Sequence, residues 1–363
     1  MRRSREAPTA LCLLAFAVML YGCGSSGGPG EGAAAKPPPA DTSGYYVTEL
    51  PPPPGALKAR ATALSNVGTD GVVWVGGNDQ AAPANAVVWK VVLPPTPSGT
   101  PTVAPIPLGS SACEVLDINE HGRAVGRLYD AGSTHAFYYD GTVTPLPDSG
   151  AESTGYAIGR DASMVCVGGE ADIVPNVGQA VLWEFPALGP LPPAPTTRIP
   201  AFEGAPSGRV CAVSDVNGLR IAAQHSGVAV LWTVLGDALV PTEIGAFWPK
   251  DINSSGHVTG DDGGTAFLWQ GGTPVALPTL RGYDHSEAWS LNDQGVVVGR
   301  AYVWGTAKTK AARWQSGKVV DLNKLVSVDG GLGEALGINN QGMMVGGALG
   351  SDGNLHAYLL RPK

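Results

Sequence analysis

An alanine that stands three residues before an aromatic or bulky apolar residue recurs seven times in this chain. The copies are Ala86-Val-Val-Trp89, Ala136-Phe-Tyr-Tyr139, Ala180-Val-Leu-Trp183, Ala229-Val-Leu-Trp232, Ala266-Phe-Leu-Trp269, Ala311-Ala-Arg-Trp314 and Ala357-Tyr-Leu-Leu360. Successive copies lie 37 to 50 residues apart, which suits a four-stranded β-propeller blade and is too long for a leucine-rich or ankyrin repeat. The chain is therefore predicted to be a repeat protein of seven units between about residue 45 and its end.

A second motif, Asn-x-x-Gly, precedes most copies of the first. It occurs at Asn119 to Gly122, Asn253 to Gly256, Asn292 to Gly295 and Asn339 to Gly342. An Asn at the first position of a type I turn caps its own backbone, and a Gly three residues later adopts the left-handed conformation that closes a hairpin. The motif predicts a turn between two short strands. Three units differ: Asn66 to Gly76 is longer, Gly159 replaces the Asn, and the turn at Asn217 is shorter.

Tight-turn residues and a further apolar strand follow the alanine motif, as in Asp140-Gly141 before Val143 to Leu146. The sequence thus predicts an all-β chain, a seven-bladed β-propeller with four-stranded blades. The last unit lacks a fourth strand, and an unmatched strand, Tyr45–Leu50, stands before the first unit. This strand is expected to pair with Ala357 to Leu360 and close the ring, which removes exposed sheet edges. An open β-solenoid is the alternative fold.

The N-terminus resembles a bacterial lipoprotein signal. Three arginines precede an apolar run from Ala10 to Leu20, which is too short to span a bilayer as a helix. Leu20-Tyr-Gly-Cys23 is similar to the lipobox, apart from Tyr21, and Gly24 is similar to the outer-membrane sorting pattern. We expect residues 1–22 to be a signal peptide, Cys23 to be lipidated, residues 23–44 to be a flexible tether and residues 45–363 to be the propeller. An ordinary signal peptide with an incidental Cys is the alternative.

Composition limits the partners. With residues 1–22 removed, 20 basic and 30 acidic residues remain, which argues against nucleic acid and against adhesion to anionic lipid. The D-x-N-x-x-G strings offer too few carboxylates for calcium, so no metal or cofactor is expected. Cys113 and Cys211 precede Asn119 and Asn217 by the same distance and are predicted to occupy equivalent places. Burial of these two and Cys166 as small apolar residues is favoured over a disulfide to Cys166.

The connections between the second and third strands of each blade, and between successive blades, fall on one face of the predicted ring. Arg127, Asp261 and Arg300 follow the glycine of the second strand in three blades, and Gly follows it in three others. With His285, these residues form the candidate binding face. No catalytic motif is recognised, so a monomeric, non-enzymatic module for a protein, peptide or glycan is favoured. A propeller lyase or hydrolase acting on glycans is the alternative.

Taken together, the two motifs resemble the HAF family of probable extracellular repeats. That pattern runs roughly A-x-x-I-N-x-x-G-x-V-V-G and then H-A-F-L-W, and His135-Ala136-Phe137, His356-Ala357-Tyr358 and Ala266-Phe-Leu-Trp269 match parts of it. The resemblance covers residues 45 to 363 and implies an exported, β-rich protein. It transfers no catalytic residue, because the pattern consists of turn and core positions.

Overall fold

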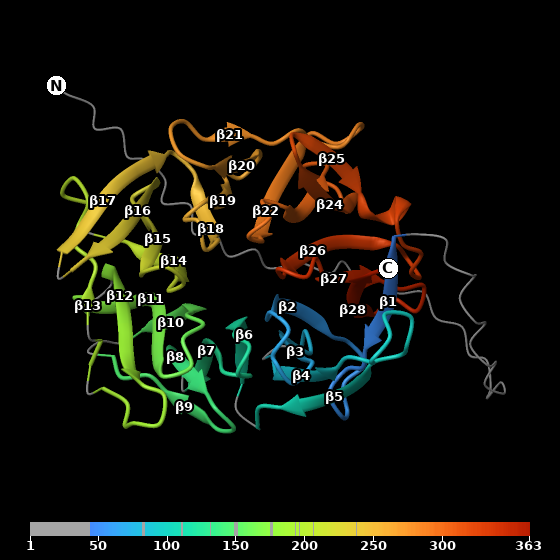
Figure 1. Cartoon of the computed structure of the whole chain (residues 1–363), viewed down its shortest axis with the longest axis horizontal. Helices are drawn as coiled ribbons and strands as arrows, with labels where there is room; N and C mark the ends of the chain where they lie inside the picture. The colour runs from blue at the N-terminus through green and yellow to red at the C-terminus, as the bar shows by residue number, and fades with distance from the viewer. Residues whose placement is uncertain are drawn as a thin grey trace. The chain divides into compact units, whose positions relative to one another are not determined.

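The computed structural model shows seven four-stranded antiparallel sheets arranged as blades in a ring (Figure 1). The structure describes residues 44–363 except 82–83, 110–111, 131, 149–151, 175–176, 193, 196, 206 and 237, and except the side chains of 173 and 174. The chain is a seven-bladed β-propeller, as predicted. The predicted signal peptide, Cys23 and the tether lie outside the described residues.

In six blades the four strands run outward from the axis in chain order. Blade 1 holds β2 (Arg60–Leu64), β3 (Val72–Asn78), β4 (Ala86–Val92) and β5 (Thr102–Pro107). Blade 2 holds β6 (Cys113–Ile118), β7 (Ala124–Asp130), β8 (Ser133–Tyr139) and β9 (Val143–Pro145). Blade 3 holds β10 (Ser153–Ile158), β11 (Met164–Val174), β12 (Val177–Pro186) and β13 (Thr197–Arg198).

The other blades follow the same plan. Blade 4 holds β14 (Arg209–Ser214), β15 (Arg220–His225), β16 (Val228–Leu235) and β17 (Ala238–Gly245). Blade 5 holds β18 (Trp248–Ile252), β19 (Val258–Asp261), β20 (Ala266–Trp269) and β21 (Val275–Ala276). Blade 6 holds β22 (His285–Leu291), β23 (Val297–Tyr302), β24 (Thr309–Gln315) and β25 (Lys318–Asp321), followed by the short 3-10 helix η1 (Leu322–Lys324).

Blade 7 joins the two ends of the described chain. It holds β26 (Leu332–Ile338), β27 (Met344–Leu349), β28 (Leu355–Pro362) and, as its outermost strand, β1 (Tyr45–Leu50). The antiparallel register runs from Tyr45 opposite Pro362 to Leu50 opposite Ala357. The predicted closure by the N-terminal strand is therefore confirmed.

The hydrophobic core is divided into seven clusters, each between two neighbouring blades. The Ala-x-x-Trp motif lies on the third strand and fills these clusters. Trp89, Trp183 and Trp314 are almost fully buried, and each indole N–H donates at 2.7 Å to a proline carbonyl just after the preceding blade, at Pro51, Pro147 and Pro278. These three copies thus tie one blade to the next, whereas Trp232 and Trp269 donate within their own blades, to His225 Nε2 at 3.4 Å and to the Gly272 carbonyl at 2.8 Å.

The Asn-x-x-Gly turns form as predicted and also connect blades. Asn119 Oδ1 accepts from the backbone N–H groups of His121 and Arg123, and Gly122 is left-handed with φ 75°. The Asn119 Nδ2 group donates to the Gly159 carbonyl of blade 3 at 2.9 Å. Equivalent bonds run from Asn253 to Asn292, from Asn292 to Asn339 and from Asn339 to Ser65.

Two expectations for blade 4 are wrong. Strand pairing places Ser214, not Asn217, at the position of Asn119, and Asn217 lies at the tip of a left-handed turn with φ 61°. Cys211 lies at a β-bulge between Val210 and Ala212, whereas Cys113 lies on the regular part of β6, so the two are not equivalent. All three thiols are free; Cys113 and Cys166 are buried and Cys211 is half-buried.

Two aspartates of the inner strands also connect blades, a role that the turn prediction missed. Asp117 accepts the backbone N–H of Ile158 in blade 3 at 2.9 Å, and Asp251 accepts that of Leu291 in blade 6 at 2.9 Å. Burial raises the pKa of Asp117 to about 7, which outweighs the lowering by its two backbone N–H donors. Asp117 is half-buried on β6, the inner strand of blade 2.

The raised pKa of Asp117 predicts a pH-dependent stability difference. Since the native pKa lies near 7 and the ordinary value is 3.8, its contribution to stability is complete below about 3.9 and is lost as the pH rises through about 7. Asn resembles the neutral carboxyl and does not titrate. The Tm of Asp117→Asn minus that of the wild type is therefore expected to rise between pH 4.5 and pH 8, measured by scanning calorimetry. A difference that falls with pH would show that the backbone donors outweigh burial.

Candidate functional site

The position that follows the second-strand glycine forms a ring of side chains near one end of the axis. Strand pairing assigns it to Asn78, Arg127, Glu170, Gln224, Asp261, Arg300 and Gly347. The expectation of Gly in three blades is therefore wrong. In the Gly76-Gly77 and Gly168-Gly169 doublets, the second glycine is the one equivalent to Gly126 of blade 2. An added Cβ on Gly77 or Gly169 would lie 2.0 or 2.1 Å from the carbonyl oxygen of Arg60 or Thr154 on the inner strand.

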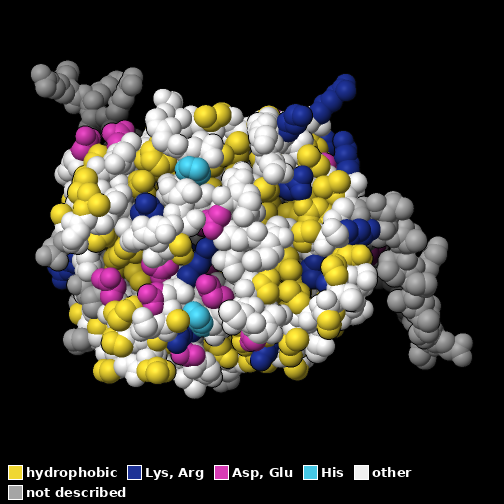
Figure 2. Space-filling model, viewed as in Figure 1, with side chains coloured by type: hydrophobic (Ala, Val, Ile, Leu, Met, Phe, Trp, Pro, Cys, Tyr) yellow, Lys and Arg dark blue, Asp and Glu magenta, His cyan; other side chains and the backbone are white. Residues whose placement is uncertain are grey.

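The inner strands place a second row opposite this ring, at Arg60, Glu114, Thr154, Arg209, Trp248, Glu287 and Glu334. We call the two rows, together with the bulge residue Lys250, the axial charge belt. It contains five basic and five acidic side chains. Figure 2 likewise shows basic and acidic side chains close together near the middle of the face in view.

The charges of the belt are paired internally. Arg300 contacts both Glu287 oxygens at 2.8 and 3.1 Å, and Arg60 contacts both Glu334 oxygens at 2.6 and 2.8 Å across the junction of blades 1 and 7. Arg127 lies 4.0 Å from Glu114 and over the Tyr156 ring. Burial lowers the pKa of Arg60, but the Glu334 carboxylate more than compensates, and the net shift is upward.

Asp261, Arg300 and His285 come together, whereas Arg127 lies three blades away. Arg300 lies over the Tyr302 ring at 5.0 Å, and the His285 ring lies 5.2 Å from the same ring. Asp261 Oδ1 accepts from the backbone N–H of Gly263, whose carbonyl accepts the Tyr302 hydroxyl at 3.0 Å. Three of the four predicted residues therefore share one site between blades 5 and 6.

Asp261 is the most perturbed acid of this site. It is 3% exposed, its Oδ2 atom has no hydrogen bond, and Lys250 Nζ lies 3.8 Å away. Burial raises the pKa of Asp261 to about 6, although Lys250 partly offsets the rise. A buried carboxyl that titrates near neutrality can hold or release a proton.

Exposed aromatic rings, which the sequence analysis did not single out, lie beside these residues. Trp304 is 68% exposed and follows β23, while Trp248 is 41% exposed and begins β18. The rings of His285, Tyr302 and Trp304 form a cluster, in which the His285 centroid lies 5.2 and 5.5 Å from those of Tyr302 and Trp304, and the latter two lie 6.5 Å apart. Both tryptophans therefore lie on the face formed by the variable connections.

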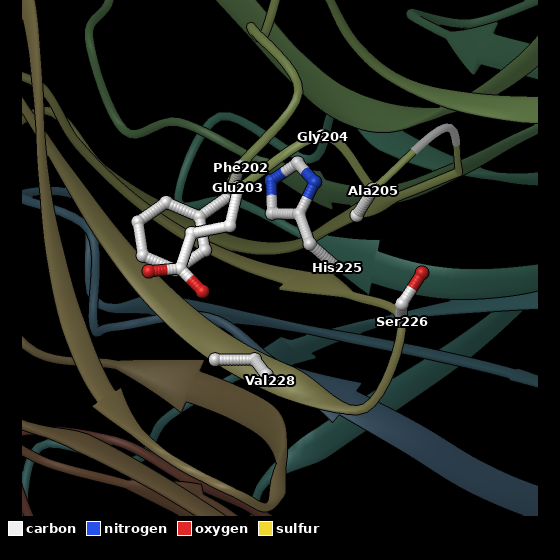
Figure 3. A pocket seen from close by; sticks show the side chains of 7 residues that line it. All are labelled: Phe202, Glu203, Gly204, Ala205, His225, Ser226 and Val228. Carbon is white, nitrogen blue, oxygen red and sulfur yellow. The ribbon is translucent and has the colours of Figure 1, made fainter.

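A pocket in blade 4 extends this aromatic surface. The pocket has a volume of about 300 Å³ and is lined by the segment Phe202, Glu203, Gly204 and Ala205 and by the turn residues His225, Ser226 and Val228. The His225 imidazole is directed toward the first of these segments (Figure 3). The Gln224 amide, oriented to satisfy its neighbours, accepts from Trp248 Nε1 at 3.0 Å and from Gly227 N at 3.2 Å. Trp248 thus adjoins the turn that lines the pocket. We call Phe202, His225, Trp248, Tyr302, His285 and Trp304 the aromatic track.

No group of three or more His, Cys, Asp or Glu side chains in the described part of the chain is placed to hold a metal ion. Within that same part, no helix is long and apolar enough to cross a membrane. What the site offers is aromatic surface, carboxylates and a half-open pocket.

No protein-family model and no curated protein matches this chain. Similar solved structures include the β-propeller domain of the Trilobed protease from Pyrococcus furiosus, at 9% identity and a TM-score of 0.48 over 84% of this chain and 94% of that one. An acylaminoacyl peptidase from Pyrococcus horikoshii is 11% identical, with a TM-score of 0.46 over 84% of this chain and 52% of that one. This chain thus corresponds to about half of that peptidase. A Trypanosoma rangeli sialidase is 12% identical, with a TM-score of 0.42 over 84% and 54%. These likenesses concern the fold alone.

Proposed function

We propose that this chain is a recognition protein of the bacterial cell envelope, which binds a protein, peptide or glycan on its loop face without turnover. The observation that carries the proposal is the pair of exposed indoles, Trp248 and Trp304, on neighbouring blades of one face. Large rigid aromatic side chains supply much of the binding energy at recognition surfaces, and variable loops on a rigid ring are suited to present them.

The charged residues of the candidate face have a supporting role in this proposal. Arg300 and Asp261 are engaged with Glu287 and Lys250, so they fix the turns on which the aromatic rings stand. Arg127, beside Glu114 and Tyr156, does the same for blades 2 and 3. Ligand contact is assigned to the aromatic track, including His285.

The full chain, solubilised in detergent, is to be screened by biolayer interferometry against neutral oligosaccharides, acidic polysaccharides and a peptide library. At least one class is expected to bind, and the Trp248→Ala/Trp304→Ala double variant is expected to lose at least about tenfold in affinity. Leu235→Ala/Val275→Ala is the matched control. Both residues are exposed beside the turn between the third and fourth strands of their blades, on the face opposite to the two tryptophans. Cleavage of a bound ligand, or binding that the double variant retains in full, would contradict the proposal.

Anchoring is the second part of the proposal and rests on the lipobox-like Leu20-Tyr-Gly-Cys23 and on the resemblance to exported HAF-type repeats. Lipid on Cys23 and the tether that follows it would hold the propeller at the outer membrane, facing the periplasm or the cell surface. Cells grown with labelled palmitate are expected to label the wild-type chain and not Cys23→Ala, which should become soluble. Membrane association that is unchanged in Cys23→Ala would count against lipidation.

A glycan-cleaving enzyme is the alternative, and one observation favours it. Asp261, whose pKa burial raises to about 6, lies in the same cluster as Glu287: burial raises the pKa of Tyr302, and each of the two carboxyls adds to that rise. A pair of carboxyl groups is the usual machinery of glycoside hydrolysis. Release of reducing ends by the wild type, abolished in Asp261→Asn, would establish this alternative.

A further inference from the structure

We propose that the ligand of the aromatic track is a neutral oligosaccharide, whose sugar rings stack on Trp304 and Trp248. This inference deepens the recognition function proposed above and rests on it. It depends on three features of the track: the exposed indoles of Trp304 and Trp248, polar groups that suit hydroxyls, and turns that present no free strand edge.

The Trp304 platform is held in place before a ligand arrives. Asp284 Oδ1 accepts the backbone N–H of Trp304 at 3.1 Å and contacts His285 Nδ1 at 2.8 Å. The same carboxylate oxygen thus positions both the Trp304 backbone and the His285 ring, and the His285 ring packs at a tilt of 31° to the Trp304 ring and of 33° to the Tyr302 ring. The rings of His285 and Tyr302 pack against each other, while Trp304 stays 68% exposed. A preordered flat surface of this kind lowers the entropic cost of binding another flat, C–H-rich ring.

The Trp248 platform is joined to the first through a single turn. An added Cβ on Gly263 would lie 3.1 Å from Trp248 Cζ3, so the glycine permits the indole to lie against this turn. The Gly263 carbonyl accepts the Tyr302 hydroxyl, and the Trp248 N–H is bound by Gln224 on the other side. Two indole surfaces on neighbouring blades, with a pocket beyond the second, suit a chain of rings better than a single small molecule.

The polar groups along the track favour hydroxyls and disfavour anions. The carboxylates of Glu203, Asp262 and Asp284 lie at the pocket, at the Gly263 turn and at the Trp304 platform. Carboxylates accept hydrogen bonds from sugar hydroxyls. Of the nearby cations, Arg300 and Lys250 are already paired with Glu287 and Asp261, and Lys308, in the turn of Trp304, donates to the Gly282 carbonyl and lies over the Tyr283 ring. The three carboxylates outnumber this one cation without a paired acid, so an acidic sugar is disfavoured.

The turns that carry the track also disfavour an extended peptide. The track crosses the connections that follow β15, β19 and β23. Peptides added to sheets use a row of unpaired backbone groups along a strand edge, and turns between paired strands present no such row. A bound oligosaccharide needs only the aromatic side chains and the carboxylates, which these turns present.

The test uses the full chain in detergent with neutral hexasaccharides of β-linked glucose, N-acetylglucosamine and mannose, and with a hexauronate as the charged comparison. Binding is followed by calorimetry and by tryptophan fluorescence. At least one neutral hexasaccharide is expected to bind, more tightly than its monosaccharide and more tightly than the hexauronate. Trp304→Ala and Trp248→Ala should each weaken binding about tenfold, while Trp304→Phe, which keeps an aromatic face, should stay within about threefold.

The variants also separate ligand contact from folding. Since Trp304 is 68% exposed, circular dichroism and Tm should be unchanged in the Trp304 variants, and Leu235→Ala should bind as the wild type does. Peptide or anionic binding that Trp304→Ala abolishes, without any neutral-glycan binding, would overturn the sugar inference and leave the recognition function standing. Absence of any ligand sensitive to Trp248 or Trp304 would overturn both.

Discussion

Removal of residues 45–50 is expected to destabilise the propeller far more than removal of residues 24–43. The deleted strand is β1, which carries the outermost ladder of blade 7 and buries Tyr45 and Leu50 to 7% and 1% exposure. Loss of two core side chains of this size costs about 5 kcal/mol or more. Tyr45 also accepts from Arg313 Nη1 of blade 6 at 2.7 Å, so two blades lose a contact.

The deletion also changes the architecture, because it exposes β28 as a free edge. A large fall in Tm, together with increased aggregation on heating, is therefore expected in differential scanning fluorimetry and light scattering. Residues 24–43 serve as the comparator, whereas Gly44 is retained because its carbonyl accepts the Lys363 N–H at 3.0 Å. Equal melting of the two truncations would mean that β1 does not hold the ring closed.

The repeat, the blade plan and the closure could be predicted because their signals are local. An Asn-x-x-Gly turn closes through bonds among its own residues, and an Ala-x-x-Trp strand pairs with the strands just before and just after it in the chain, so the recurrence of the two motifs predicted the number of blades. The strand Tyr45–Leu50 could be assigned to the last blade because it had no other partner within a repeat. These inferences need no knowledge of how one blade faces the next.

The contacts between blades could not be predicted in the same way. Every inner strand carries a β-bulge, at Thr62, Leu116, Tyr156, Cys211, Lys250, Trp289 and Leu336. One extra residue changes which side chains share a face. The count from Cys211 to Asn217 suggested a false equivalence with Cys113 because Ser214, not Asn217, occupies the position of Asn119, so Cys211 falls on the bulge position that Leu116 holds in blade 2. No residue type in these seven positions marks the bulge, so the sequence contains no signal for it.

Three of the four candidate residues lie together because position within the repeat predicts which face a residue occupies. That position does not identify the partner of a charge. Arg60 pairs with Glu334 across 274 residues of sequence, and Arg300 finds Glu287 on the adjacent strand. Trp304 follows no repeat pattern, and its exposure depends on the turn after β23. A prediction based on recurring residues therefore could not include the aromatic track.

The adjacent glycines of β27 are expected to respond oppositely to the same substitution. An added Cβ on Gly346 would lie 2.1 Å from the Glu334 carbonyl oxygen on the inner strand, a separation that real Cβ atoms do not show. The strand must shift, and Glu334 also binds Arg60 of blade 1, so the shift extends to the closure of the ring. Gly346→Ala is expected to cost about 2–4 kcal/mol of unfolding free energy.

Gly347→Ala is the matched control, one residue further along the same strand. Its added Cβ would lie 3.4 Å from Leu355 Cδ1 and 3.5 Å from Glu334 Oε1, which are ordinary contacts. Because alanine restricts the unfolded chain more than glycine does, this variant should be neutral or stabilised by up to about 1 kcal/mol. Urea titration followed by tryptophan fluorescence measures both midpoints. Similar midpoints for the two variants would refute the claim that the close approach to the inner strand is what requires glycine at position 346.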